Sequence, residues 1–383
     1  MPLSHLTVVE FAGVLAGPAV GMFLAELGAR VIKVENPVSG GDVTRSWTLG
    51  GEGEGVSKAL SPYFAAVNWS KESVALDFAR PADLRTARRL AARADVILVS
   101  YKPGDAARFG LDYPSVAVSN PDVIYGEVTA YGPEVERPGY DAVIQAETGF
   151  TYLNGEPRGE PLKLPVALMD VLAGHQLKQA VLLALLRRER TGEGSQVSVS
   201  LVRSGLAALV NQATNWLIAG VNPRRLGSGH PNIVPYGSSF ATRDDDAIVL
   251  AVGTDRQFAA LCTALEVPEL ADEARFATNP ARVEHRDELE EILARRVAEY
   301  GRNELLERLG AGGVPAGPIL DVAQALAQPA AAPLRHMVER PDGSLIEGLR
   351  TVAFEPSDMY RPRDLGAPPR LGEHTEAVRR ELD

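Results

Sequence analysis

The sequence has few of the residue types on which several common sites depend. It holds one cysteine, Cys262, so a disulfide framework and a Cys-x-x-Cys metal site are both excluded. Its six histidines are scattered without the spacing of a zinc-binding pair. A Gly-x-Ser-x-Gly elbow and a P-loop are also missing, which disfavours a serine hydrolase and a kinase. We therefore expect no metal site, and a buried core thiol at Cys262.

Excess positive charge and long apolar runs are missing as well. A net charge of −11 over 383 residues argues against broad binding to nucleic acid or to an anionic membrane. The apolar pattern near 171–186 is interrupted by residues such as His175 and Lys178, so it does not predict a membrane span. The first residues do not resemble a signal peptide. We expect a cytoplasmic enzyme whose anionic ligands meet a locally basic pocket.

Strand and helix patterns alternate in the first part of the chain. They lie at residues 5–11, 18–28, 29–35, 73–78, 81–93, 94–101 and 122–132. Such alternation indicates a mostly parallel sheet covered by helices on both faces. The glycine-rich segment 48–60 predicts a loop, and 201–219 predicts a helix.

A cluster of Gly, Pro, Asn and Ser at 220–239 indicates a crossing into a second domain. That domain holds a strand pattern at 247–252, a helix at 255–266, charged helices within 285–309 and a break at 313–319. The tail predicts a hairpin that turns at Pro341-Asp342-Gly343. We expect a large domain of residues 1–215 with 330–383, a small domain at 225–320, and linkers around 216–224 and 321–329.

The opening strand, glycine-rich turn and helix suggest a dinucleotide-binding start. Glu35 lies where an acid for the ribose hydroxyls would be expected. However, Gly13, Gly17 and Gly21 are four residues apart, and the fingerprint needs Gly-x-Gly-x-x-Gly. An NAD-dependent oxidoreductase is therefore the less favoured alternative.

Asp170 is the only acid between residues 164 and 188, and it precedes a long helix pattern. An aspartate there is commonly a helix N-cap, which satisfies free N–H groups of the first turn. A functional reading needs support from other parts of the chain.

Several stretches together resemble the family III CoA-transferases, a group that includes formyl-CoA and carnitine CoA-transferases and α-methylacyl-CoA racemases. They occur in the family's order and span nearly the whole chain: VVEFAGVLAGPAVGMFLAELGARVIKVE, AAVNWSKESVALDF, ADVILVSYKPGDAARFGL, RPGYDAVIQAETG, ALMDVLAGHQLKQAVLLAL, GSGHPNIVPY, GVPAGPI and LGEHT. The resemblance implies a Rossmann-like large α/β domain with a parallel sheet, a smaller α+β domain, and an interlocked homodimer.

By this resemblance Asp170 is the catalytic nucleophile. It would attack an acyl-CoA thioester and pass through aspartyl-acyl anhydride and aspartyl-CoA intermediates. Coenzyme A is then a substrate, and no metal or redox cofactor is required. Positions matched to the CoA and acyl sites are Val14, Leu15, Ala16, Leu76, Phe78, Ser100, Tyr101, Lys102, Arg108 and Tyr140. Formyl-CoA transferase has a glutamine where this chain has Leu15, which disfavours formyl transfer.

The segment LGSGHP, with Gly227, Gly229 and His230, matches the glycine-rich loop that shields the intermediates from water. A plain interdomain turn is the alternative reading. At Tyr140 the racemases carry a histidine, and a phenol with a pKa of about 10 is a poor base near neutral pH. Asp141 beside it keeps epimerisation open as an alternative.

The resemblance thus implies transfer of CoA from an acyl-CoA donor to a free carboxylic acid. The stretch GSGHPNIVPY is similar to the branch that uses dicarboxylates, often with succinyl-CoA. Candidates for binding a second carboxylate are Arg45, Arg137 and Arg224. A non-catalytic CoA-binding regulator is a third hypothesis, in which Asp170 is only a helix cap.

Overall fold

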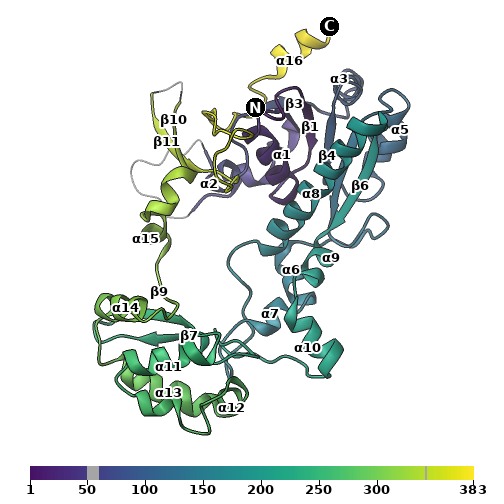
Figure 1. The fold of residues 1–383 in the computed structure, drawn as a ribbon. Coiled ribbons are helices and arrows are strands. Elements are labelled where there is room, and N and C mark those ends of the chain that lie inside the picture. Colours follow the sequence, from purple (N-terminus) through teal and green to yellow (C-terminus); the bar gives the residue numbers. More distant parts are fainter. Residues whose placement is uncertain (50–59, 341–342) are drawn as a thin grey trace. The chain divides into compact units, whose positions relative to one another are not determined.

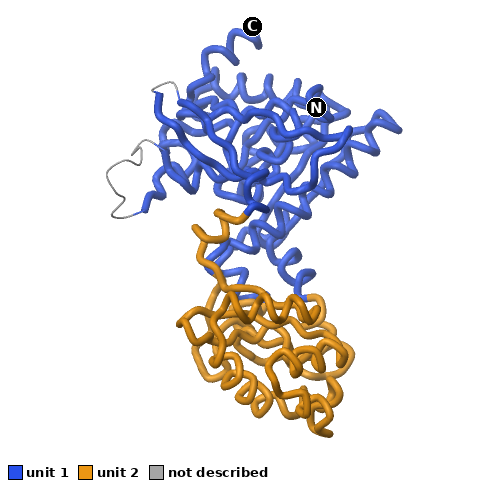
Figure 2. The backbone as a smooth tube through the Cα atoms, turned by 60° about the vertical axis from the view of Figure 1, so that its left-hand side comes forward, with its two compact units in different colours: residues 1–148, 165–209, 329–383 blue, residues 149–164, 210–328 orange. Residues whose placement is uncertain are grey.

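The computed structural model describes residues 1–49, 60–340 and 343–383, and the chain forms two compact units (Figures 1 and 2). Unit 1 consists of residues 1–148, 165–209 and 329–383, and unit 2 of residues 149–164 and 210–328. The segment 149–164, expected in the large domain, groups with unit 2. Hydrogen bonds join its backbone to the rest of unit 2, because the Gly227 N–H donates to the Gly155 carbonyl and Arg225 donates to the Tyr152 carbonyl.

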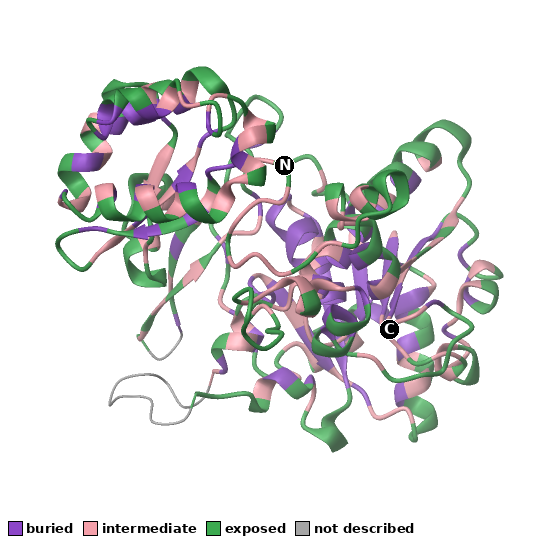
Figure 3. Ribbon diagram, turned by 90° about the horizontal axis from the view of Figure 1, so that it is seen from below, coloured by how far each residue is buried: buried purple, intermediate pink, exposed green. Residues whose placement is uncertain are grey.

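Unit 1 is built on a parallel sheet with the strand order β3-β2-β1-β4-β5-β6 (Figure 1). The strands are β1 Thr7–Phe11, β2 Arg30–Glu35, β3 Lys71–Ala75, β4 Val96–Val99, β5 Ile124–Thr129 and β6 Ser195–Ser200. The central strands are almost entirely buried (Figure 3), as expected for apolar, β-branched segments covered on both faces. The predicted α/β fold class is confirmed.

Helices cover both faces of this sheet. The helices of unit 1 are α1 Ala16–Glu26, α2 Pro62–Ala65, α3 Pro81–Ala91, α4 Asp105–Phe109, α5 Tyr113–Ala117, α6 Asp141–Glu147, α8 Leu168–Thr191, α9 Leu201–Ala207 and α16 Thr375–Leu382, with 3-10 turns at Pro37–Ser39, Val43–Ser46 and Pro329–Leu334. Side chains of α3 and α16 share an apolar core with one face, and α1 and α8 pack together on the other. Gly126 and Gly174 permit this packing, since a Cβ would lie 3.3 Å from Leu177 at the first and 3.2 Å from the Ala16 carbonyl at the second.

Unit 2 has its own antiparallel sheet and apolar core. Its elements are α7 Phe150–Leu153, α10 Asn211–Ala219, β7 Tyr236–Ala241, β8 Ala247–Ala251, α11 Asp255–Ala264, the 3-10 turn Pro268–Ala271, α12 Asn279–Glu284, α13 Arg286–Val297, α14 Arg302–Ala311, β9 Ala316–Pro318 and α15 Val322–Leu326. Cys262 is buried in this core, as predicted. The segment 313–319, expected as a break, contains the strand β9, which pairs with β8.

Two further expectations have mixed outcomes. The helix expected over 201–219 is interrupted, because Val210 has φ +46° and separates α9 from α10. The predicted hairpin is confirmed in its strands β10 Arg335–Glu339 and β11 Leu345–Leu349, whereas Pro341 and Asp342 of its turn lie outside the described residues. Most of the glycine-rich segment 48–60 also lies outside the described residues.

No helix in the described part of the chain is long and apolar enough to cross a membrane.

Candidate active site

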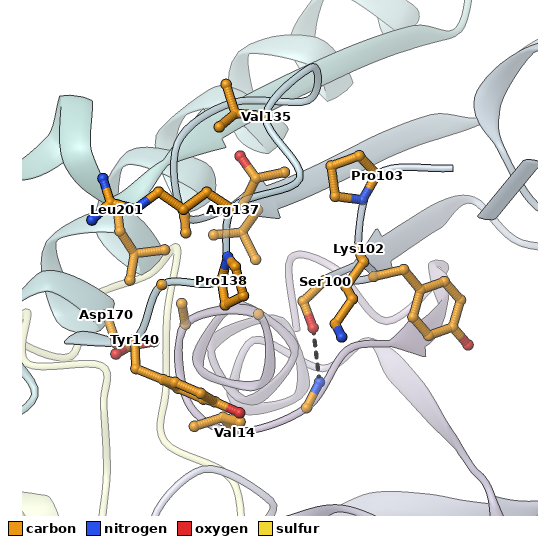
Figure 4. Close-up of a pocket in the computed structure, with 18 of the residues that line it drawn as sticks. Val14, Ser100, Lys102, Pro103, Val135, Arg137, Pro138, Tyr140, Asp170 and Leu201 are labelled. Atoms are coloured by element: carbon orange, nitrogen blue, oxygen red, sulfur yellow. Dashed lines mark hydrogen bonds between the residues drawn. The ribbon is translucent and has the colours of Figure 1, made fainter. Parts of the chain in front are cut away.

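A pocket of about 250 Å³ lies at the carboxyl ends of the strands of unit 1 (Figure 4). Its lining comes from the segments that follow β1, β4 and β5, together with Asp170 of α8 and Leu201 of α9. The strand order reverses between β1 and β4, and open parallel sheets bind ligands at such a switch point. The topology therefore predicts a ligand site at the place where the pocket is found.

The turn after β1 forms one wall of the pocket, and its N–H groups are directed at side chains. The Gly13 N–H donates to Ser100 Oγ at 3.0 Å, the dashed contact in Figure 4. The Val14 N–H donates to the Asp42 carboxylate at 3.2 and 3.3 Å. Val14 has φ +68°, a conformation that costs a β-branched residue about 1–3 kcal/mol. Contacts around the turn must therefore hold it in this shape.

Asp170 lies in the first turn of α8 but does not cap it. The N-cap position is Ala167, and the Asp141 carboxylate accepts the Met169 N–H at 2.8 Å. Asp141 thus performs the capping that the sequence suggested for Asp170. The Asp170 carboxylate instead faces the pocket and accepts the Ala16 N–H.

The surroundings of Asp170 favour a reactive carboxylate. Burial, and then the negative charge of Asp141, raise its pKa to about 6, against the opposing effect of the Ala16 hydrogen bond. At neutral pH the group is mostly ionised yet poorly solvated. A carboxylate in this state is a better nucleophile than one in bulk water.

Tyr140 and Asp141 begin α6 at the edge of the same pocket. The Tyr140 side chain is 64% exposed and lines the pocket. Asp141 is buried, and its second oxygen accepts from Gln145 Nε2 at 2.8 Å. Since both oxygens of Asp141 already accept hydrogen bonds, this carboxylate is poorly placed to act as a free base.

The structure brings together some of the residues expected at the CoA and acyl sites and separates others. Those that line the pocket with Asp170 are Val14, Ala16, Ser100, Tyr101, Lys102 and Tyr140. Leu15 instead packs against the cluster that contains Met22 and Trp69, and Leu76 is 1% exposed within the sheet core. These two positions contribute through packing.

Phe78 and Arg108 lie in an aromatic cluster that also contains the pocket residue Tyr101. The ring centroids of Phe78 and Phe109 are 5.0 Å apart, and those of Tyr101 and Phe109 are 6.3 Å apart. The Arg108 guanidinium lies 4.6 Å from the centre of the Phe109 ring and pairs with Asp105 at 3.1 Å. An aromatic surface next to a cation suits a nucleotide base joined to phosphate.

Gly227, Gly229 and His230 lie in unit 2. Gly227 has φ +61°, which favours glycine. His230 Nδ1 accepts the Asn232 N–H at 3.1 Å, and the His230 ring stacks edge-on against Tyr236. Their expected shielding role stays a prediction.

Three further side chains differ in their relation to the pocket: Arg137, Arg45 and Tyr63. Arg137 lines it, with its guanidinium 4.7 Å from the centre of the Tyr131 ring and paired with Glu147. Arg45, a second candidate for a distal carboxylate, is held by Glu35 and the Pro369 carbonyl. Tyr63 was not among the residues predicted from the sequence, and its pKa is raised by burial and by the charges of Asp170 and Asp141. Tyr63 belongs to no recognisable motif, so only the fold places it near the nucleophile.

Comparison with known proteins identifies the family of this chain. The model of CoA-transferase family III matches residues 3–375. The chain belongs to this family.

The chain is 40% identical to a succinate–glutarate CoA-transferase of Agrobacterium fabrum, over 100% of this chain and 96% of that protein. It is 35% identical to the human succinyl-CoA:glutarate CoA-transferase, over 100% and 86% of the two chains. A crystal structure of a CAIB/BAIF family protein from Brucella suis superposes with a TM-score of 0.84 at 41% identity, and all of both chains is covered. The expected class of enzyme, a family III CoA-transferase, is thereby confirmed.

Proposed function

We propose that this enzyme transfers CoA from succinyl-CoA to a second dicarboxylic acid, with Asp170 as the nucleophile. The observation that carries the proposal is the Asp170 carboxylate, which faces the pocket with a pKa raised to about 6 by burial and by Asp141. The names of the relatives, which act on succinate or succinyl-CoA and glutarate, support the choice of substrates.

The proposed reaction proceeds through covalent intermediates on Asp170. An Asp170 oxygen attacks the thioester carbonyl, and the C–S bond breaks to give a mixed anhydride and CoA thiolate. The thiolate attacks the aspartyl carbonyl and releases succinate, which leaves an aspartyl-CoA thioester. The acceptor carboxylate then displaces the thiolate, and the thiolate takes the acceptor acyl group and frees Asp170. No metal or redox cofactor enters these steps.

Arg137 is the residue we propose for the distal carboxylate of the acceptor. Among Arg45, Arg137 and Arg224, it is the one that lines the pocket with Asp170. A planar guanidinium pairs well with a carboxylate. Its present partner, Glu147, would exchange for the incoming anion.

The alternatives receive less support from the same contacts. Epimerisation needs a pair of proton-transfer groups, and the pocket offers a phenol at Tyr140 beside the occupied carboxylate of Asp141. A dinucleotide would need free N–H groups in the turn after β1, but those of Gly13, Val14 and Ala16 donate to side chains.

Peptide mass spectrometry after brief incubation with succinyl-CoA and hydroxylamine tests the proposal. A hydroxamate on the peptide that carries Asp170 is the expected result, because hydroxylamine attacks activated acyl groups. The Asp170→Asn variant serves as the control, since an amide cannot form the anhydride. An unmodified wild-type peptide would leave the CoA-binding regulator as the better hypothesis.

We also propose that the enzyme is a cytoplasmic homodimer. Apolar side chains that are exposed in each unit support an association surface: Leu183 and Leu186 of α8 in unit 1, and Leu217 and Ile218 of α10 in unit 2. Light scattering on the purified protein should give twice the mass of one chain.

A further inference from the structure

Four charged side chains are buried together on the face of the sheet that α1 covers. This buried charge network consists of Glu10 of β1, Lys33 of β2, Lys71 of β3 and Asp42. Glu10 pairs with Lys33 at 3.0 Å and with Lys71 at 2.8 Å, and Lys33 also pairs with Asp42 at 2.9 Å. Glu10 and Lys33 are register partners on neighbouring strands, and both are 0% exposed. The two positive and two negative charges cancel.

Besides the two bonds that Asp42 accepts from Thr44, the network makes hydrogen bonds to the backbone around the turn after β1. Lys33 Nζ donates to the Ala12 carbonyl at 2.7 Å, and Lys71 Nζ donates to the Pro18 carbonyl at 2.8 Å. The Asp42 carboxylate accepts from the Val14 N–H. The turn is thereby held before, within and after the residues that line the pocket.

Stability does not by itself account for this arrangement. Burying ion pairs costs desolvation energy, and apolar residues of similar volume often stabilise a fold equally well. The network also lies so close to α1 that a Cβ on Gly21 would be 2.0 Å from Glu10 Oε2. What the network does secure is the left-handed conformation at Val14, which a β-branched residue disfavours.

We propose that the buried charge network positions the nucleophile. It holds residues 13–17 so that the Ala16 N–H donates to the Asp170 carboxylate and sets the direction in which the carboxylate faces the pocket. The inference rests on the proposed nucleophilic role of Asp170. Of the described residues that line the pocket, none belongs to the network, so its members are positioning residues.

The main test is the double variant Lys33→Met, Asp42→Asn. It removes one charge of each sign, so the remaining Glu10–Lys71 pair stays neutral and the protein should fold. We expect kcat to fall about 10- to 100-fold, because the reacting groups are misplaced, while the Kd for CoA rises by less than about threefold, because this turn is only one part of the pocket lining.

A pH–rate profile separates positioning from a general loss of structure. The Ala16 hydrogen bond lowers the pKa of Asp170, which is about 6, so its loss should move the acid limb of the profile to higher pH. The other titratable groups facing Asp170, Asp141 and Tyr63, remain in the variant.

A matched control removes an ion pair at the other end of the strands. Arg30 and Glu72 pair at 2.7 Å where β2 and β3 begin, away from the pocket. The variant Arg30→Met, Glu72→Gln should keep the wild-type kcat and acid limb. If the network double variant does not fold, Asp42→Asn alone should still lower kcat about fivefold, as expected when a charged hydrogen bond becomes neutral.

Hydroxamate trapping distinguishes the two ways in which the inference could fail. Absence of trapping on wild-type Asp170 would overturn the proposed function itself. Trapping on the wild type, together with a wild-type kcat and acid limb in the network variants, would overturn only the positioning role. A parallel loss of kcat and CoA affinity would also overturn it, because that pattern indicates general damage.

Discussion

The two units bury charge in different ways. In unit 2 the guanidinium of Arg282 is fully buried and donates to the carbonyls of Val234 and Phe276 and to Asp255, all within that unit. In unit 1 the buried charge network donates to the backbone just before and just after the turn that lines the pocket. The same physical device, a buried cation that satisfies carbonyl groups, therefore fixes loops for folding in one unit and fixes the site in the other.

Two buried carboxylates of unit 1, Asp170 and Asp42, have pKa values shifted in opposite directions. Asp170 has one backbone donor and a nearby like charge, so its ionised form is poorly satisfied. Asp42 is also buried, but two Thr44 donors and Lys33 hold the pKa of its carboxyl below the usual value despite that burial. The number of donors around each carboxylate separates a reactive group from a structural one.

Replacing Asp170 should break the function of unit 1 most completely. In Asp170→Asn we expect transfer to fall at least about 1000-fold, because no anhydride can form, while CoA still binds. Steady-state transfer from succinyl-CoA and calorimetric titration with CoA measure the two quantities. Asp122→Asn, an exposed position, is the control, and residual transfer within tenfold of the wild type would contradict the nucleophile assignment.

Replacing Arg282 should damage unit 2 through stability instead. Arg282→Met leaves two buried carbonyls without their donors, and we expect the free energy of unfolding to fall by about 3 kcal/mol. Urea unfolding measures this change. Arg295→Met in α13, which removes an exposed pair, should change stability by less than about 0.5 kcal/mol. Equal effects of the two variants would contradict the contrast between the units.

The same Asp170→Asn variant should stabilise unit 1. The folded-state pKa of about 6 lies above the unfolded value, so ionisation disfavours the folded state. Neutralisation should add about 2–3 kcal/mol at pH 7 and above. The gain should shrink as pH falls below about 6 and vanish below about pH 3, where the wild-type group is protonated in both states. Thermal unfolding as a function of pH tests this, and a pH-independent gain would argue against a raised pKa.

Arg137→Met should sharpen the assignment of the acceptor site. We expect the KM for a dicarboxylate to rise about tenfold, since one charged contact is lost, and the KM for a monocarboxylate of the same length to change little. Arg187→Met in α8 is the control, because Arg187 pairs with Glu193 outside the pocket lining. Equal effects on both acids would remove Arg137 from the distal site.

The smallest effect is expected at Tyr140. Its exposed phenol lines the pocket, so Tyr140→Phe should lower kcat by no more than about fivefold. A loss of several orders of magnitude would show that the hydroxyl takes part in the chemistry. Exchange of an acyl-CoA α-proton with D2O, measured without an acceptor acid, would then test epimerisation.

Much of the fold follows from local sequence patterns. The alternation of apolar strands and helices predicted the parallel sheet, and the apolar setting of Cys262 predicted a core thiol. The break at Val210 was missed because the flanking residues have ordinary helix propensity, and a single φ of +46° is a tertiary outcome. The buried charge network was not predicted, although charges inside apolar strands are a visible sign of it: Glu10 lies in TVVEF and Lys33 in RVIKVE.

The site was only partly accessible from the sequence. By itself the sequence determined the alternating strands and helices of the first part of the chain. By resemblance it singled out Asp170 and six other residues that line the pocket, Val14, Ala16, Ser100, Tyr101, Lys102 and Tyr140. Only the tertiary structure decided that Asp141 caps α8, that Ala16 donates to Asp170, and that Leu15 and Leu76 face apolar cores. The physical reason is that hydrogen bonds and burial join residues far apart in the chain, whereas propensity and periodicity describe only near neighbours.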